Sequence, residues 1–290
     1  MKLKEPEGRA TQGARPRTSR GRPAFVVNLL LIIGAVLTAF PLLWMLSVSF
    51  MPTGAASTYP PPLLPANPTL DNYRQLFANH NAGRYMLNST IVASLATVIA
   101  LVLNTMAGYA FAKLRFKGRE RIFQTLLGAL VIPAQVTMIP LFALVKEMGL
   151  ISTYGGVIVP SLASVFGIFL IRQYALSLPD ELLEAARIDG ASEGRIFWSL
   201  VVPLLQPILV TLAILTFLAT WNDFMWPLIV LTDQKLHTLP VALAGLSREH
   251  VQDNELMMAG AVITVLPVLA LFLALQRYYI AGILSGSVKG

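Results

Sequence analysis

Six apolar segments dominate the sequence, and they restrict the chain to folds that a lipid bilayer can hold. The segments run over residues 24–48, 85–112, 122–145, 154–171, 203–231 and 256–275. A helix that crosses the hydrocarbon core needs about 20 predominantly apolar residues. The composition agrees, because only 13% of the residues are charged, whereas soluble domains carry about 25%. The sequence therefore predicts an all-α, polytopic membrane protein with six transmembrane helices.

The first of these segments also has the basic start of a signal peptide. However, its apolar run extends from Ala24 to about Leu46, and no small-residue cleavage pattern follows closely. The apolar region of a signal peptide covers only about 7–15 residues. We therefore expect this segment to be retained as a span.

The basic residues are distributed unevenly between the two sides of the predicted spans. Seventeen of the 22 lysines and arginines fall in the amino-terminal tail, the loop 113–121, the segment 172–195 and the carboxyl end. The positive-inside rule then places both termini in the cytoplasm. We expect a basic tail over 1–22, a six-span domain over 23–280 with a cytoplasmic insert over 177–202, and a second tail over 281–290.

Several classes of chemistry are disfavoured by composition. The chain has no cysteine, and its three histidines are scattered, so we expect no disulfide, metal or catalytic site. The net charge of +7 comes from clusters beside apolar runs, which indicates contact with membrane lipid rather than nucleic acid. No phosphate-binding loop of the form G-x-x-x-x-G-K-[ST] occurs, so we expect no cofactor in this chain.

The insert carries the sequence LPDELLEAARIDGASEGRIFWSLVVPLL, over Leu178–Leu205. Ser177 is predicted to cap a helix that begins at Leu178–Pro179, with an apolar face of Leu182, Leu183, Ala186 and Ile188. Gly190 is expected to end this helix in a left-handed conformation. Ser192 is then predicted to cap a second helix, which continues past Pro203 into the fifth span.

An alternative interpretation makes the insert an interfacial helix that rests on lipid headgroups. Such helices favour Lys and Arg on their polar face. The insert carries five acidic and only two basic side chains, which anionic lipid would repel. A protein partner therefore suits it better.

The segment EAARIDGASEGRIFWSLVVP resembles the EAA loop of bacterial ABC importer permeases. That pattern is Glu-Ala-Ala, three residues, Gly, nine residues, an aliphatic residue and a nearby Pro, and this chain has Glu184-Ala185-Ala186, Gly190, Leu200 and Pro203 at those offsets. The form EAARIDGAS is similar to the carbohydrate-uptake branch. Further similar segments are FPLLWMLSVSF, NST, TWNDFMWPLIVL and YYIAGILSGSVKG, so the resemblance extends from the first span to the last residue.

The resemblance implies a type I ABC importer permease, located in the bacterial inner membrane, that moves a sugar or sugar-like solute. Its implied partners are an ATPase dimer that binds ATP and Mg²⁺, a second homologous permease and an extracytoplasmic solute-binding protein. The implied ATPase-coupling residues are Glu184, Ala185, Ala186, Asp189 and Gly190. The carboxyl-terminal residues Gly282, Gly286 and Lys289 are further candidates for contact with the ATPase.

One charged residue, Asp223, lies well inside a predicted span. Intramembrane carboxylates usually face a bundle interior or a cavity. With Trp221 and Asn222 it offers a stacking face and hydrogen-bonding groups for a hydroxyl-rich solute; the alternative is a polar clasp between helices. Asn104, in the second span, is a further candidate, although its small-residue stripe (Ala96, Ala100, Gly108 and Ala112) indicates helix packing.

Two other functions remain as alternatives. A proton- or sodium-driven carrier would need more intramembrane ionisable groups or paired repeats with broken helices. A membrane-embedded enzyme would need clustered histidines, cysteines or carboxylates, which the sequence lacks. Monosaccharides, oligosaccharides, polyols and sugar phosphates all remain possible solutes.

Overall fold

The computed structural model describes residues 21–249 and 253–287, and within these ranges it is all-α and contains no strand. The chain divides into two compact units, one that ends at Trp44 and one that begins at Met45. Helix α1 (Gly21–Ser49) supplies the described part of the first unit. Most apolar side chains between Phe25 and Leu43 are exposed, as expected for a helix surrounded by lipid.

Six segments of the described chain meet the length and composition of a membrane span. Three are single helices over Phe25–Ser49, Ala82–Lys113 and Asn254–Ala274, which belong to α1, α3 (Ala82–Lys113) and α14 (Asn254–Ser287). The other three are helix pairs with a sharp bend. The prediction of an all-α membrane protein is confirmed, with six spans if each bent pair counts as one.

Prolines mark the bends, because proline lacks a backbone donor and disfavours helical conformation in the residue before it. Helices α4 (Arg119–Ala129) and α5 (Ala134–Glu147) meet at 105°, with Pro133 immediately before α5. Helix α6 (Tyr154–Ile158) and the 3₁₀ turn η2 (Val159–Ser161), which contains Pro160, meet α7 (Val165–Ala175) at 41°.

The fifth predicted span, 203–231, is not one helix. Helix α11 (Gln206–Trp221) ends before a break at Asn222–Phe224, and α12 (Met225–Val230) follows. Before α11, helix α9 (Glu193–Ile196), a π-helix η3 (Phe197–Val201) and α10 (Val202–Leu204) form a segment bent by 79° from α11. Pro207 in the first turn of α11 lacks a backbone donor, which removes one link across the bend at Leu205.

Helix α3 is the centre of the second unit. Its stripe of small residues (Ala96, Ala100, Asn104, Gly108 and Ala112) is buried, which confirms the packing interpretation. At Gly108 an added Cβ would lie 2.6 Å from the Cβ of Ile171 in α7, so only glycine permits this approach.

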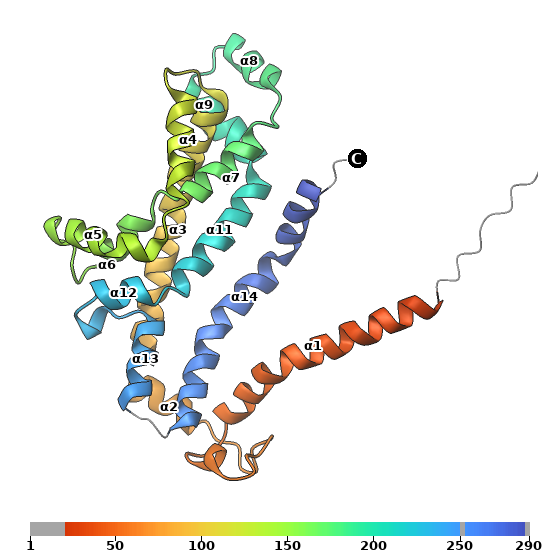
Figure 1. Cartoon of the computed structure of the whole chain (residues 1–290), viewed down its shortest axis with the longest axis vertical. Coiled ribbons are helices and arrows are strands. Elements are labelled where there is room, and N and C mark those ends of the chain that lie inside the picture. Colours follow the sequence, from red (N-terminus) through yellow and green to blue (C-terminus); the bar gives the residue numbers. More distant parts are fainter. Residues whose placement is uncertain (1–20, 250–252, 288–290) are drawn as a thin grey trace, which may run out of the picture. The chain divides into compact units, whose positions relative to one another are not determined.

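The second unit has two distinct polar ends. Helix α8 (Asp180–Ile188) and α9 lie at one end of it, whereas α2 (Asp71–Ala78) and α13 (Leu239–Glu249) lie at the other (Figure 1). Two further 3₁₀ turns, η1 (Ala55–Ser57) and η4 (Gln234–Leu236), lie in the connecting loops. Helix α14 continues to Ser287, so much of the predicted tail over 281–290 is helical.

Candidate functional site

The insert is a compact helix–turn–helix element, but its first helix begins differently from the prediction. Helix α8 begins at Asp180 after Pro179, and Ser177 does not cap it. The Ser177 hydroxyl instead donates to the Tyr174 carbonyl at 2.7 Å, which is a bond within the preceding turn. The predicted Ser177 cap is therefore wrong, and acidic residues Asp180 and Glu181 alone complement the positive helix end.

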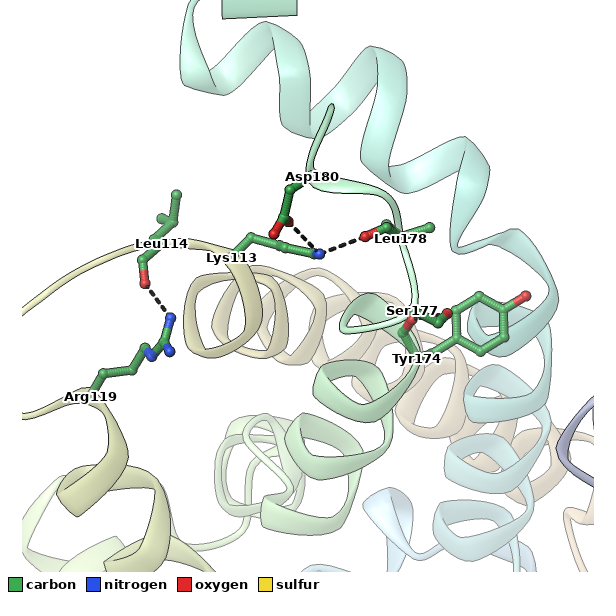
Figure 2. A network of polar contacts seen from close by, with 7 residues as sticks. All are labelled: Lys113, Leu114, Arg119, Tyr174, Ser177, Leu178 and Asp180. Atoms are coloured by element: carbon green, nitrogen blue, oxygen red, sulfur yellow. Dashed lines mark hydrogen bonds and ion pairs between the residues drawn. The ribbon is translucent and has the colours of Figure 1, made fainter. Parts of the chain in front are cut away.

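Lys113, the last residue of α3, ties the start of α8 to the bundle. Its ammonium donates to the Leu178 carbonyl and to Oδ1 of Asp180, each at 2.6 Å (Figure 2). The Lys113 side chain is only 6% exposed, while that of Asp180 is 72% exposed. The same hydrogen bond holds the pKa of Asp180 below its ordinary value, so this carboxylate is charged at neutral pH.

The turn between α8 and α9 agrees with the prediction. Gly190 has φ of +80°, which glycine adopts without steric cost, and the Ala191 amide donates to the Ala186 carbonyl at 3.0 Å. Ser192 accepts a hydrogen bond from the Arg195 amide at 3.4 Å, so the predicted second cap is confirmed. Gly190 therefore fixes a sharp reversal of the chain.

An exposed ion pair joins α8 and α9 across this turn. The Arg187 guanidinium donates to both carboxylate oxygens of Glu193, at 2.6 and 3.4 Å. This contact lowers the pKa of Glu193 and raises that of Arg187. Because both side chains are well exposed, the pair orients the two helices more than it stabilises them.

One apolar side chain anchors α8 in the core. Leu183 is 2% exposed and packs in a cluster with Tyr109, Ile171 and Phe197. The predicted apolar face is wrong in part, because Leu182 and Ile188 point outward and Ile188 is 86% exposed. The short helix thus packs through Leu183 against α3 and α7, while Leu182, Ala185 and Ile188 are exposed.

The predicted coupling residues separate into two groups. Glu184, Ala185, Asp189 and Gly190 are exposed, whereas Ala186 is half-buried and packs against the core cluster. Together with Ile188 the exposed group forms a tip that is both acidic and apolar. We call the exposed residues Glu184, Ala185, Ile188, Asp189 and Gly190 the α8 tip. Such a rigid, half-apolar projection is suited to insertion into a partner protein.

The carboxyl-terminal candidates lie apart from the insert in sequence. Gly282 and Gly286 belong to the last turns of α14. Lys289 lies outside the described residues.

The three predicted solute-contact residues in the fifth span do not form one site. Trp221 is 1% exposed, stacks on Phe217 and donates through its indole nitrogen to the Thr264 carbonyl of α14 at 3.1 Å. Asn222 is exposed and donates to the Leu218 carbonyl at 2.9 Å. Asp223 accepts from the Trp226 amide at 3.4 Å. The expected stacking face is thus turned into the bundle.

Asp223 does face a cavity. It lines a space of about 310 Å³ between α5, α6, η2, α11 and α12, beside a second of about 540 Å³. The two cavities share Pro160, Ser161, Ala219 and Thr220. Sequence reasoning missed Ser161 and Thr220, because single hydroxyls in apolar spans are common at helix-packing contacts. Pro160 was the available signal, since bends open space between helices.

Asn104 has a packing role in this structure. Its side chain is fully buried, and Oδ1 accepts from the Ser164 amide at 3.0 Å, at the start of α7. It therefore clasps α3 to α7. Asn88, which sequence reasoning noted only within the NST segment, makes a similar clasp: Nδ2 donates to the Lys235 and His237 carbonyls, both at 2.9 Å.

Among the described residues, no group of three or more His, Asp or Glu side chains is placed to hold a metal ion. The structure thus brings together an anchored insert, mid-bundle cavities and interhelical clasps.

Residues 104–284 match the family described as binding-protein-dependent transport system inner membrane component. An arabinooligosaccharide transport permease of Halalkalibacterium halodurans is 40% identical over 91% of this chain and 98% of that protein. The melibiose/raffinose/stachyose import permease of Bacillus subtilis is 33% identical over 94% and 100%, respectively.

Solved structures support the same fold. A chain of a bacterial ABC transporter involved in the import of the acidic polysaccharide alginate has a TM-score of 0.81, with 24% identity over 91% of this chain and all of that one. A second chain, from such a transporter in complex with a periplasmic protein bound to an alginate pentasaccharide, has a TM-score of 0.62, with 14% identity over 87% of this chain and 92% of that one.

Proposed function

Because the chain belongs to the family of binding-protein-dependent transport system inner membrane components, we propose that it is a permease subunit of an ATP-driven importer for a sugar or sugar-like solute. The similar curated permeases carry names for the transport of arabinooligosaccharides and of melibiose, raffinose and stachyose. Those names support a carbohydrate, and they leave the particular sugar open.

The α8 tip is the surface through which this chain engages a separate ATPase. The observation that carries this proposal is the pairing of an exposed tip with a buried anchor on one short helix. Ile188 is available for contact with a partner, while Leu183 and Lys113 fix the opposite side of the helix to the bundle. A partner that moves the tip therefore moves α3 and α7 with it.

ATP and Mg²⁺ belong to that partner, because this chain contains no phosphate-binding loop. The proposed assembly also contains a second permease of the same family and an extracytoplasmic solute-binding protein. The excess of Lys and Arg beside the insert and in the amino-terminal tail supports a cytoplasmic location for both termini. The end of the second unit with α2 and α13 is then extracytoplasmic.

The solute path of this chain runs along the two mid-bundle cavities. Ser161, Thr220 and Asp223 provide hydroxyl and carboxylate groups there. A carboxylate in a span is expensive unless it faces such a cavity. Asp223 therefore contacts the solute or the water that accompanies it.

Reconstitution with an ATPase, a second permease and a binding protein that are encoded by neighbouring genes tests the function. The complex should take up a sugar only when ATP is supplied, and Glu184→Lys should release the ATPase. Glu147→Lys, an equal charge reversal at an exposed position of α5, is the control and should leave the complex intact. Uptake driven by an ion gradient without ATP would instead support a secondary carrier.

A further inference from the structure

We propose that the end of the second unit opposite the insert holds a binding site for a neutral, hydroxyl-rich ligand. The site is a cavity of about 380 Å³ formed where α2 meets α3, the α11–α12 junction, η4 and α13. This volume lies within the range of about 300–1,000 Å³ typical of small-molecule sites. Its assignment to a sugar and to the extracytoplasmic side rests on the proposed function.

The chemistry of the lining favours a carbohydrate. Two aromatic rings, Tyr85 and Phe224, line the cavity together with the amides of Asn79, Asn81 and Gln234. Each side-chain amide offers two donors and an acceptor, which matches the mixed donor and acceptor character of sugar hydroxyls. Aromatic rings supply an apolar surface on which the C–H face of a sugar ring can lie.

The charge of the lining argues against an ionised ligand. Of the described residues that line the cavity, none is an aspartate, glutamate, lysine or arginine. The lining includes His80 and His237 but no permanently charged side chain. A phosphate or carboxylate group that entered it would therefore lose water without gaining a permanent opposite charge, which costs several kcal/mol. The site therefore discriminates in favour of neutral sugars and polyols.

His237 adds a further acceptor. Its Nε2 lies 3.1 Å from the Leu231 carbonyl oxygen, which can only accept, so Nε2 must carry the hydrogen. In the neutral imidazole, Nδ1 is then an acceptor for a ligand hydroxyl.

The wall that carries Gln234 and His237 is preformed. The buried Asn88 amide donates to the carbonyls of Lys235 and His237, and its oxygen accepts from the Tyr154 hydroxyl at 2.7 Å. The buried Ser89 hydroxyl accepts from the Leu239 amide at 2.8 Å. These bonds hold η4 and the start of α13 against α3, so little order has to be created when a ligand binds.

The position of the cavity gives it a place on the route of the solute. Its lining residues come in part from α13 and from the turn between α2 and α3. Helices α2 and α13 lie at the end of the unit away from α8 (Figure 1). A sugar that arrives from outside reaches this site before the mid-bundle cavities. We therefore assign it as a receiving site, occupied between release from a binding protein and entry into the spans.

Because the chain has no cysteine, a single introduced thiol tests this assignment. In the reconstituted complex, Gln234→Cys would be labelled with a maleimide in the presence of neutral di- and trisaccharides, including any sugar that the complex imports. Labelling is followed by the mass of this chain. A saccharide at about ten times its Kd fills about nine-tenths of the sites, so labelling should slow by about tenfold. Arg74→Cys, exposed on α2 outside the cavity lining, should label at an unchanged rate.

The outcomes separate the site from the proposed function. Unchanged labelling of Cys at position 234, in a complex that imports a sugar with ATP, would overturn the receiving site and leave the transport function standing. Equal protection by trigalacturonic acid would overturn its preference for neutral ligands. Protection without any ATP-driven uptake would support the site and contradict the proposed function.

Discussion

At the scale of single residues, the strongest constraint on the insert is the ammonium of Lys113. A nearly buried lysine loses hydration, and this cost is offset only if its hydrogens find partners. Two partners at 2.6 Å, a carbonyl and a carboxylate, both belong to the start of the insert. The positive charge of Lys113 thus lies where the insert joins the spans, and this one side chain links the insert to α3.

Replacing Lys113 by methionine tests this tether. Lys113→Met retains the length and apolar contacts of the stem but removes both hydrogen bonds. Because the substitution removes both bonds between the end of α3 and the start of the insert, we expect thermal stability in detergent to fall and the sugar transported per ATP to decrease. Lys117→Met, at an exposed position in the following loop, is the control. Equal effects of the two substitutions would contradict a specific tether.

The acidic residues of the insert predict a simple dependence on pH. The pKa values of Asp180 and Glu193 are lowered by Lys113 and Arg187, respectively. Their contribution is complete above the ordinary values of about 3.9 and 4.3, and is lost only as the pH falls through the lowered values. Hydrogen exchange of amides 180–190, corrected for intrinsic rates, should show constant protection from about pH 8 to 5. Protection that decreases between pH 7 and 5 would show that these pairs do not hold the insert.

At the scale of elements, the contact between α3 and α7 depends on a glycine. An added Cβ at Gly108 would lie 2.6 Å from Cβ and Cγ2 of Ile171 and 3.0 Å from the Arg172 amide nitrogen. Gly108→Ala should therefore lower the free energy of unfolding by about 1–3 kcal/mol through overpacking. Gly128→Ala in α4 meets no atom within 4 Å and should be neutral or stabilising, because alanine favours helix. Thermal melting in detergent compares the two, and an unaffected Gly108 variant would contradict this packing.

Sequence reasoning succeeded for elements that local chemistry determines. The apolar segments, the Gly190 turn and the Ser192 cap all depend on neighbours in the chain. The structure confirms the turn and the cap, and it has six spans if each bent helix pair counts as one. The predicted Ser177 cap is wrong, because that hydroxyl donates to the carbonyl of Tyr174, and the start of the insert is held instead by Lys113, which is 65 residues from Leu178 in the sequence. The burial of Trp221 could not be predicted either, since its partner Thr264 lies on α14. Contacts between distant segments leave no local pattern to detect.

At the scale of the whole molecule, α3 connects the two ends of the second unit. Near its amino-terminal end Asn88 and Ser89 hold η4 and α13, and at its carboxyl-terminal end Lys113 holds α8. A continuous helix of 32 residues joins these contacts. Displacement of the insert can therefore reach the cavity near α13 through one rigid element, without local unfolding.

This arrangement predicts that docking and transmission can be separated by mutation. Ile188→Glu changes only the exposed tip and should release the ATPase. Leu183→Ala removes the buried anchor, which costs about 2–5 kcal/mol for a core leucine. This substitution should leave the α8 tip available to the ATPase but remove the packing contact of α8 with α3 and α7.

Retention of the ATPase during purification and the sugar transported per ATP distinguish these outcomes. Ile188→Glu should lower ATPase retention, whereas Leu183→Ala should retain the ATPase and hydrolyse ATP with little uptake. Leu182→Ala is the matched control for the anchor, because Leu182 is exposed on the same helix. If Leu183→Ala loses the ATPase as completely as Ile188→Glu does, then the anchor serves only to fold the insert. Movement of the insert would then have to reach the spans through the segment from α9 to α11, which contains the π-helix and the bend at Leu205.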